Sequence, residues 1–142
     1  MIFTEVGIGP FYDGEFDHLA ASSIVLVIGD PPVGFASVGV VDGVAHLFQL
    51  SVEPSVARRG LGTALVNSVC DWARAEGYGA VTLTTFRDVP WNGPFYRKLG
   101  FQPVEELSPE LAGIREHEKA IGDDNFGHRI AMRKDLNPAS PT

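Results

Sequence analysis

The sequence predicts an α+β fold, with a mixed, mostly antiparallel twisted sheet and flanking helices, in one domain spanning residues 1–142. Two patterns carry this prediction. Short β-branched runs separated by turn residues fill residues 24–52, as in an antiparallel meander. From residue 61 the apolar residues recur every three or four positions, as on one face of a helix. A hydrophobic fraction of 44% with 20% charged residues excludes wholesale disorder.

The first half of the chain predicts one short helix and three strands. Asp13 to Ser22 can form a helix with its apolar residues on one side. The Asp42-Gly43 pair is the strongest short hairpin signal in the sequence. The strands are predicted over Ile24 to Ile28, Val33 to Val41 and Val44 to Val52.

The second half alternates helices with strands. Leu61, Leu65, Val69 and Trp72 form the stripe of a helix, and Gly77 suits the residue after its C-terminus. We expect the remaining elements to be a strand over Ala80 to Phe86, a short helix from Pro94 to Gly100, a strand over Phe101 to Val104, a helix capped by Ser108 and ending near Ile121, and a strand over Arg129 to Arg133.

Cysteine and charge restrict the classes of protein. A single cysteine, Cys70, excludes a disulfide scaffold and fits a reducing cytosol, so we expect a cytoplasmic protein. The chain shows neither a signal peptide nor an apolar run long enough to span a membrane. The histidines lack the spacing of metal ligands, so we expect no metal.

The acidic residues gather in the first half. The net charge is −7, and residues 1–57 contain no Lys or Arg. This half repels nucleic acid and anionic lipid and attracts a cationic partner. Solubility alone is the other interpretation, and the sequence leaves both open.

The segment from Val52 to Ala64 has the pattern of an anion-binding loop. A strand ends, a glycine-bearing loop follows and a helix begins, and helix N-termini present unpaired N–H groups that bind phosphate. Gly60 and Gly62 allow close approach of the backbone, and Arg58 and Arg59 add positive charge. A purely structural turn is the alternative.

Two known phosphate-binding loops do not fit this segment. A Walker loop needs a Gly-Lys-Ser/Thr sequence, which is absent. A dinucleotide-binding fingerprint needs a third glycine where Leu65 stands, within a parallel βαβ unit, whereas the preceding strand belongs to the predicted antiparallel meander.

From about Ile24 to Phe101 the sequence resembles the GNAT superfamily of N-acetyltransferases. The first matching part is the strand Leu50-Ser51-Val52, then Pro54, then the segment from Arg59 to Leu65. The second is the segment Phe95-Tyr96-Arg97-Lys98-Leu99-Gly100-Phe101, which matches the family's Tyr, three residues, then Gly-Phe. The two parts occur in the family's order, separated by a predicted helix and strand.

The resemblance implies transfer of an acetyl group from acetyl-CoA to an amine, by direct attack in a ternary complex without a metal. Backbone groups around Leu50 and Val52 would meet the pantetheine arm, and Tyr96 would protonate the departing thiolate. The pyrophosphate would lie against Arg58, Arg59, Gly60, Leu61, Gly62, Thr63 and Ala64.

The sequence departs from the family pattern at three places. Ala57 stands where the loop usually begins with Gln or Arg. Val89 replaces an Asn that touches the coenzyme arm, and the nearest Asn is Asn92, so we expect a different loop path with Asn92 as the arm contact. Only 23 residues precede the Ile24 strand, so we expect either that the family's first strand is missing or that the start codon is internal. A missing strand would expose a sheet edge and favour a homodimer.

His46 is the candidate base that would deprotonate the amine. It lies six residues before Val52, where some family members carry their base, and an imidazole pKa of about 6.5 suits this role. A hydrogen-bonded, idle histidine is the equal alternative. Glu116 and Glu118 are expected to be solvated, and Trp91 either flanks an acceptor pocket or covers core.

The leading hypothesis is therefore an N-acetyltransferase that acts on a small cationic amine or a lysine-like side chain. A non-catalytic acyl-CoA-binding module is the first alternative, because the short N-terminus could leave the acceptor site incomplete. A nucleotide-binding module that uses Gly60 and Gly62 is the second.

Overall fold

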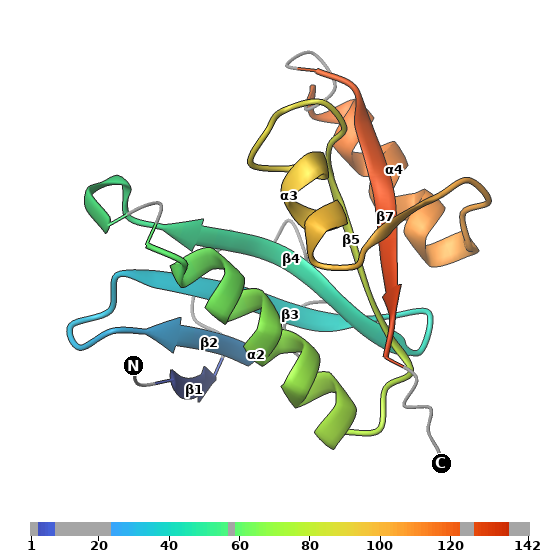
Figure 1. Cartoon of the computed structure of the whole chain (residues 1–142). Coiled ribbons are helices and arrows are strands. Elements are labelled where there is room, and N and C mark those ends of the chain that lie inside the picture. Colours follow the sequence, from blue (N-terminus) through green and yellow to red (C-terminus); the bar gives the residue numbers. More distant parts are fainter. Residues whose placement is uncertain (1–2, 8–23, 57–58, 123–126, 137–142) are drawn as a thin grey trace.

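The computed structural model describes residues 3–7, 24–56, 59–122 and 127–136, and its centre is one seven-stranded sheet (Figure 1). The strand order is β1-β2-β3-β4-β5-β7-β6. The predicted α+β fold, a mixed and mostly antiparallel sheet with flanking helices, is confirmed. The strands are β1 (Phe3–Gly7), β2 (Ile24–Ile28), β3 (Gly34–Val41), β4 (Val44–Val52), β5 (Ala80–Phe86), β6 (Gln102–Val104) and β7 (Arg129–Asp135). The helices are the 3₁₀ turn η1 (Pro54–Val56), α2 (Leu61–Ala75), α3 (Gly93–Lys98) and α4 (Pro109–Ala120).

The meander forms as the sequence predicts, and β2 and β4 have the predicted bounds. Asp42 and Gly43 join β3 to β4 with φ values of 55° and 77°. Positive φ at both central residues is the requirement of the type I′ turn, whose twist matches that of the strands.

The prediction that the first strand is missing is wrong. Phe3–Gly7 forms β1 and pairs antiparallel with β2, with Phe3 opposite Ile28. The strand needs only five residues, so it fits within a short N-terminal segment. The homodimer was expected because a missing strand would leave this sheet edge exposed. Since β1 pairs with β2, that reason for a homodimer no longer holds. The helix predicted over Asp13 to Ser22 lies outside the described residues.

β4 and β5 separate along their length, which opens the sheet. They pair in parallel at two positions, Ala45 with Val81 and His46 with Thr82, and not beyond. On its other side β4 pairs with β3 throughout, with a bulge at Phe48, because Ser37 is opposite Gln49 whereas Val38 is opposite Leu47. The predicted placement of β4 in an antiparallel meander counted as evidence against a parallel βαβ unit. That inference is wrong, because β4 is antiparallel to β3 but parallel to β5, and β4, α2 and β5 form a βαβ unit.

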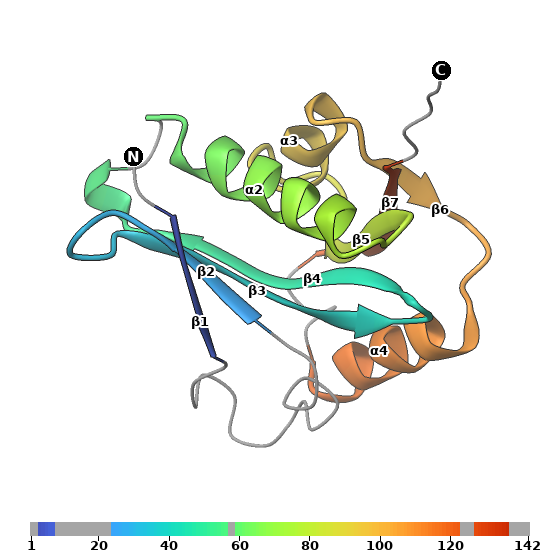
Figure 2. The same cartoon turned by 90° about the horizontal axis from the view of Figure 1, so that it is seen from below.

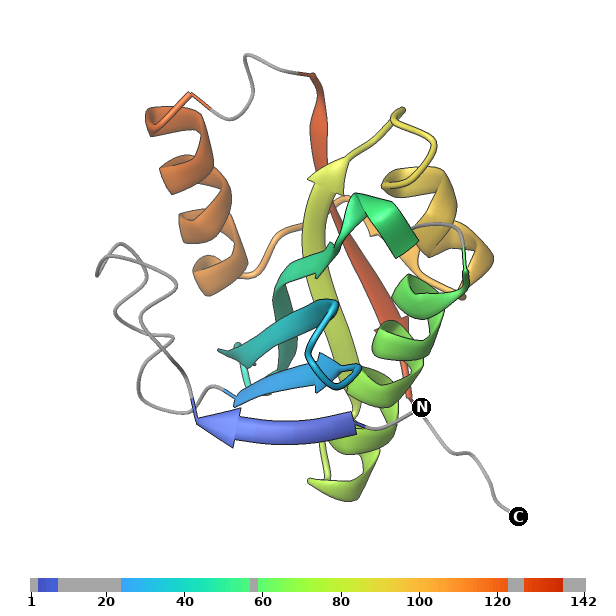
Figure 3. The same cartoon turned by 90° about the vertical axis from the view of Figure 1, so that its left-hand side faces the viewer.

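Helices cover both faces of the sheet. α2 and α3 lie on one face and α4 on the other (Figures 2 and 3). The apolar stripe of α2 is buried as predicted, with Leu65 and Val69 packed against the strands. Gly77 follows α2 with φ 90°, and Ser108 and Pro109 begin α4. No helix in the described part of the chain is long and apolar enough to cross a membrane.

Candidate functional site

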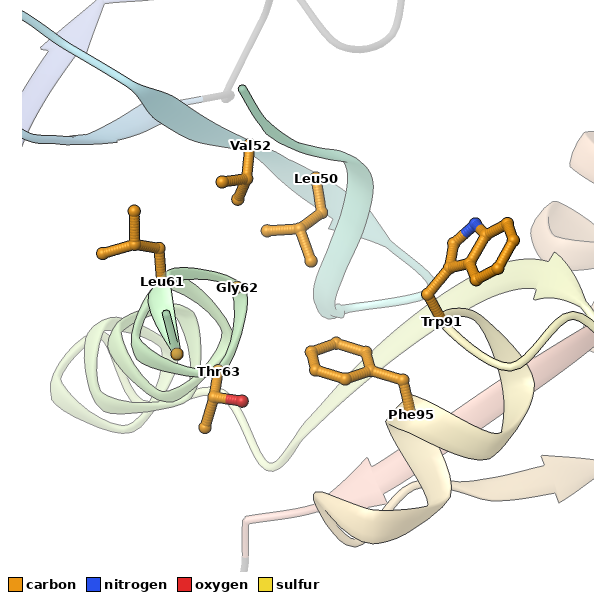
Figure 4. A pocket seen from close by; sticks show the side chains of 8 residues that line it. Leu50, Val52, Leu61, Gly62, Thr63, Trp91 and Phe95 are labelled. Carbon is orange, nitrogen blue, oxygen red and sulfur yellow. The ribbon is translucent and has the colours of Figure 1, made fainter. Parts of the chain in front are cut away.

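A pocket of about 470 Å³ lies where β4 separates from β5, and we call it the α2 pocket (Figure 4). Its walls come from the end of β4, the first turn of α2 with its N-cap, the segment that connects β5 to α3, and α3 itself. The lining residues are Leu50, Val52, Gly60, Leu61, Gly62, Thr63, Trp91 and Phe95.

The N-terminus of α2 presents unpaired N–H groups at this pocket. Gly60 is the N-cap residue, with φ 80° and ψ 9°, and no side chain caps the helix. The N–H groups of Leu61, Gly62 and Thr63 therefore have no intrahelical acceptor, and the helix dipole adds partial positive charge. Nothing lies within 4 Å of a Cβ built on Gly60, so space for an anion adjoins these groups.

The end of β4 supplies the opposite wall. Leu50 and Val52 line the pocket beyond the last residue that pairs with β5. Among the described residues, no strand pairs with β4 on this edge beyond His46, so a ligand that carries amides can approach the backbone there.

Tyr96 lies beneath the pocket in the core. It is only 7% exposed and does not line the cavity. Its ring contacts those of Phe95 and Phe101, with centroids 5.0 and 5.6 Å away. Burial raises the pKa of the Tyr96 hydroxyl, because ionisation would place a charge in an apolar environment. The phenol therefore stays protonated at neutral pH.

His46 lies on the other face of the sheet. Ala45 and Leu47 pack into the α2 core, so His46, between them, points toward the α4 side. It is 1% exposed, its Nδ1 lies 2.7 Å from Thr82 Oγ1, and its ring contacts Phe48 at 4.6 Å. His46 does not line the pocket.

The structure brings together six of the residues proposed from sequence as coenzyme contacts: Leu50, Val52, Gly60, Leu61, Gly62 and Thr63. Arg59, Ala64 and Asn92 do not line the pocket, and Arg58 lies outside the described residues. Ala64 N–H already donates to Gly60 O at 3.0 Å, and Asn92 Nδ2 donates to Trp91 O at 3.3 Å.

Two aromatic residues also line the pocket, and sequence reasoning missed one of them, Phe95. Phe95 precedes Tyr96, and its ring lies 3.6 Å from a Cβ built on Gly62. Trp91 was expected at an acceptor pocket or over core, but it covers no core, since it is 73% exposed at the α2 pocket. Phe95 could have been found from its place beside Tyr96 on α3, whereas no sequence signal locates Trp91.

The prediction that Glu118 is solvated is wrong. This carboxylate is 7% exposed, between α4 and the sheet. It accepts from Arg115 Nη1 at 2.8 Å, Arg129 Nη2 at 3.2 Å and Thr84 Oγ1 at 2.5 Å. Arg129 also lies over the Phe86 ring. Burial with these partners makes the cluster a structural tie between α4 and the β5–β7 pair, while Glu116 is exposed as predicted.

Cys70 is a buried core residue. Burial raises the pKa of its thiol. Within the described residues, no group of three or more His, Cys, Asp or Glu is close enough to hold a metal ion.

An open sheet edge beside a helix N-terminus is the site that the resemblance to the GNAT superfamily implied, and a comparison with protein-family models identifies the same family. The model of the Acetyltransferase (GNAT) family matches residues 3–101. The match covers more than half of the chain, so the protein belongs to this family.

Two curated relatives and a solved structure illustrate the similarity. A Trypanosoma brucei brucei glucosamine 6-phosphate N-acetyltransferase is 37% identical over 44% of this chain and 40% of its own. An uncharacterized N-acetyltransferase of Methanocaldococcus jannaschii is 34% identical over 51% of this chain and 32% of its own. The chain therefore spans less than half the length of these relatives. The structure of an aminoglycoside 6'-N-acetyltransferase complexed with coenzyme A has a TM-score of 0.65 at 19% identity, covering 99% of this chain and 100% of that one.

Tyr96→Phe should make folding stability less sensitive to alkaline pH. A raised pKa in the fold means that ionisation favours the unfolded chain, so wild-type stability is retained below about pH 10 and falls above it, by at most about 1.4 kcal/mol per pH unit from this group. Urea unfolding of both proteins between pH 8 and 11 measures the difference. Equal losses in the two proteins would assign the alkaline transition to another group.

Proposed function

We propose that this protein is an acetyl-CoA-dependent N-acetyltransferase, in which residues 1–142 act as one cytoplasmic domain. Its acceptor is the primary amine of a small cationic molecule or of a lysine-like side chain. The observation that carries the proposal is the pocket that joins the free N–H groups of α2 to the open edge of β4. Membership of the GNAT family supports it.

The pocket suits the two chemically different halves of acetyl-CoA. The first-turn N–H groups from Leu61 to Thr63 would donate to the pyrophosphate, with Arg59 nearby in sequence as an added positive charge. The pantetheine amides would pair with the backbone at Leu50 and Val52. Ala64 is left out because its N–H already donates to Gly60 O, and Asn92 is left out because it does not line the pocket.

The positions of His46 and Tyr96 fit a reaction across the opened sheet. A base on the α4 face and an acid on the α2 face can serve one reacting centre only where the strands have parted, and β4 and β5 part just after His46. The ammonium gives a proton to His46, and the amine nitrogen attacks the thioester carbon. A backbone N–H of β4 would stabilise the oxyanion. The C–S bond then breaks, Tyr96 gives its proton to the thiolate, and the second proton of the former amine nitrogen passes to Tyr96 and restores the phenol.

A non-catalytic acyl-CoA-binding module is the second candidate. Both His46 and Tyr96 are almost fully buried and lie outside the pocket lining, which favours binding without turnover. Release of free thiol from acetyl-CoA in the presence of polyamines, aminoglycosides or lysine peptides supports the enzyme, whereas binding without release supports the module.

Gly60→Glu should abolish the rise in Tm that coenzyme A causes, because it places a carboxylate beside the pyrophosphate site. Ligand at 100 times its Kd stabilises the wild type by about 2.7 kcal/mol. Gly77→Glu is the matched control, since Gly60 and Gly77 have φ values of 80° and 90° and both have open space at Cβ. It should lose stability but keep the coenzyme-induced shift in thermal unfolding. A full shift in Gly60→Glu would contradict the site.

His46→Ala should lower kcat and remove the acidic limb of the pH–rate profile, while the Kd of coenzyme A stays within about twofold. Thr82→Val keeps the imidazole and removes the hydroxyl at 2.7 Å, so it should lower kcat less and retain the acidic limb. Steady-state kinetics between pH 5 and 9 measure both variants. An unchanged profile in His46→Ala would show that the proton leaves by another route.

The kcat/KM for the acceptor should fall as ionic strength rises, because residues 1–57 contain no Lys or Arg and would attract a cation. The measurement uses saturating acetyl-CoA, so that screening of the coenzyme does not contribute, with a neutral amine for comparison. A flat salt response, or a preference for the neutral amine, would contradict a cationic acceptor.

A further inference from the structure

Trp91 is the most exposed large apolar side chain among the described residues. It is 73% exposed, against 49% for Ile121 and 37% for Leu107. It is also the only one of these three that lines the α2 pocket. Figure 4 shows it across the pocket from Leu61, with Leu50 between them. An indole in this position offers an apolar wall to whatever occupies the pocket.

The backbone holds Trp91 on a tight turn. Asn92 N–H donates to Val89 O at 2.8 Å, which closes a four-residue turn with Pro90 and Trp91 at its centre. The ends of the segment are fixed as well: Arg87 N–H donates to His128 O at 2.8 Å, and a Cβ on Gly93 would lie 2.3 Å from Arg87 O. The exposed ring is therefore mounted on an ordered segment, which reduces the entropy lost when a ligand covers it.

We propose that Trp91 is a coenzyme-binding residue that packs over the pantetheine arm of the acyl-CoA. The inference rests on the proposed function. In coenzyme A, the pantetheine arm and the adenosine are attached to opposite ends of the pyrophosphate. The part that reaches the open edge of β4 passes Leu50, and Trp91 faces that path. Apolar contact with the indole is what this segment offers to the arm, because Trp91 lines the pocket and Asn92 does not.

The chain offers a matched fluorescence control, because it contains only two tryptophans. Trp72 is half-buried on α2, packs near Tyr78 at 5.8 Å and is not a pocket residue. In Trp72→Phe, which retains Trp91, coenzyme A should shift the emission to the blue and reduce quenching by acrylamide. In Trp91→Phe, which retains Trp72, it should leave the emission unchanged.

Calorimetry with two ligands then locates the contact. Trp91→Ala should raise the Kd of coenzyme A about tenfold and leave the Kd of 3′-phospho-ADP, which lacks the arm, unchanged. An equal loss for both ligands would show that Trp91 stacks on adenine and would overturn the proposal. An unchanged Kd of coenzyme A would also overturn it while leaving the proposed function intact. Absence of coenzyme A binding to the wild type would overturn both.

Discussion

The separation of β4 from β5 is the constraint on which the site depends. A parallel pair normally continues its hydrogen bonds along the whole strand, yet here pairing stops after two positions, at His46 and Thr82. The bulge at Phe48 lies just beyond, and a bulge bends its strand and increases the local twist. β4 keeps β3 as its partner and turns away from β5. The opening therefore leaves the end of β4 without β5 as a pairing partner and does not disrupt the meander.

The opened sheet also decides which side chains can meet. Strand alternation sends Leu47 into the α2 core and His46 to the α4 face, while Tyr96 belongs to the α2 side. In a continuous sheet the backbone would separate these groups completely. The proposed reaction therefore requires a ligand in the pocket to contact His46 at the point where β4 and β5 stop pairing. The same opening explains why the α2 pocket has one polar wall of helix N–H groups and one wall of strand edge.

Much of the fold could be predicted because its signals are local. The positive φ values at Asp42 and Gly43, the glycine after α2 and the stripe from Leu61 need only a few neighbouring residues. The parallel pairing of β4 with β5 could not be read in this way, because it depends on how α2 packs. β1 was missed for a different reason: residues 1–23 were expected to hold a strand and two helices of average length, whereas the strand itself needs only five residues. The six lining residues at the end of β4 and the start of α2 belong to the strand–loop–helix motif, so the sequence alone identifies them. Trp91 lies on the turn from Val89 to Asn92, and no sequence motif predicts the direction of that turn.

The buried cluster around Glu118 shows how the β5 side of the opening is held. β5 has β7 as its neighbour along its length but lacks β4 beyond Thr82. Arg129 Nη2 reaches from β7 to both the carbonyl and the hydroxyl of Thr84, and Glu118 joins this pair to α4. Burying these charges costs solvation energy, which only mutual pairing and hydrogen bonds offset, so loss of one partner would leave another uncompensated. The tie thus fixes β5 where strand pairing with β4 no longer does, and the sheet can stay open without the edge of β5 becoming mobile.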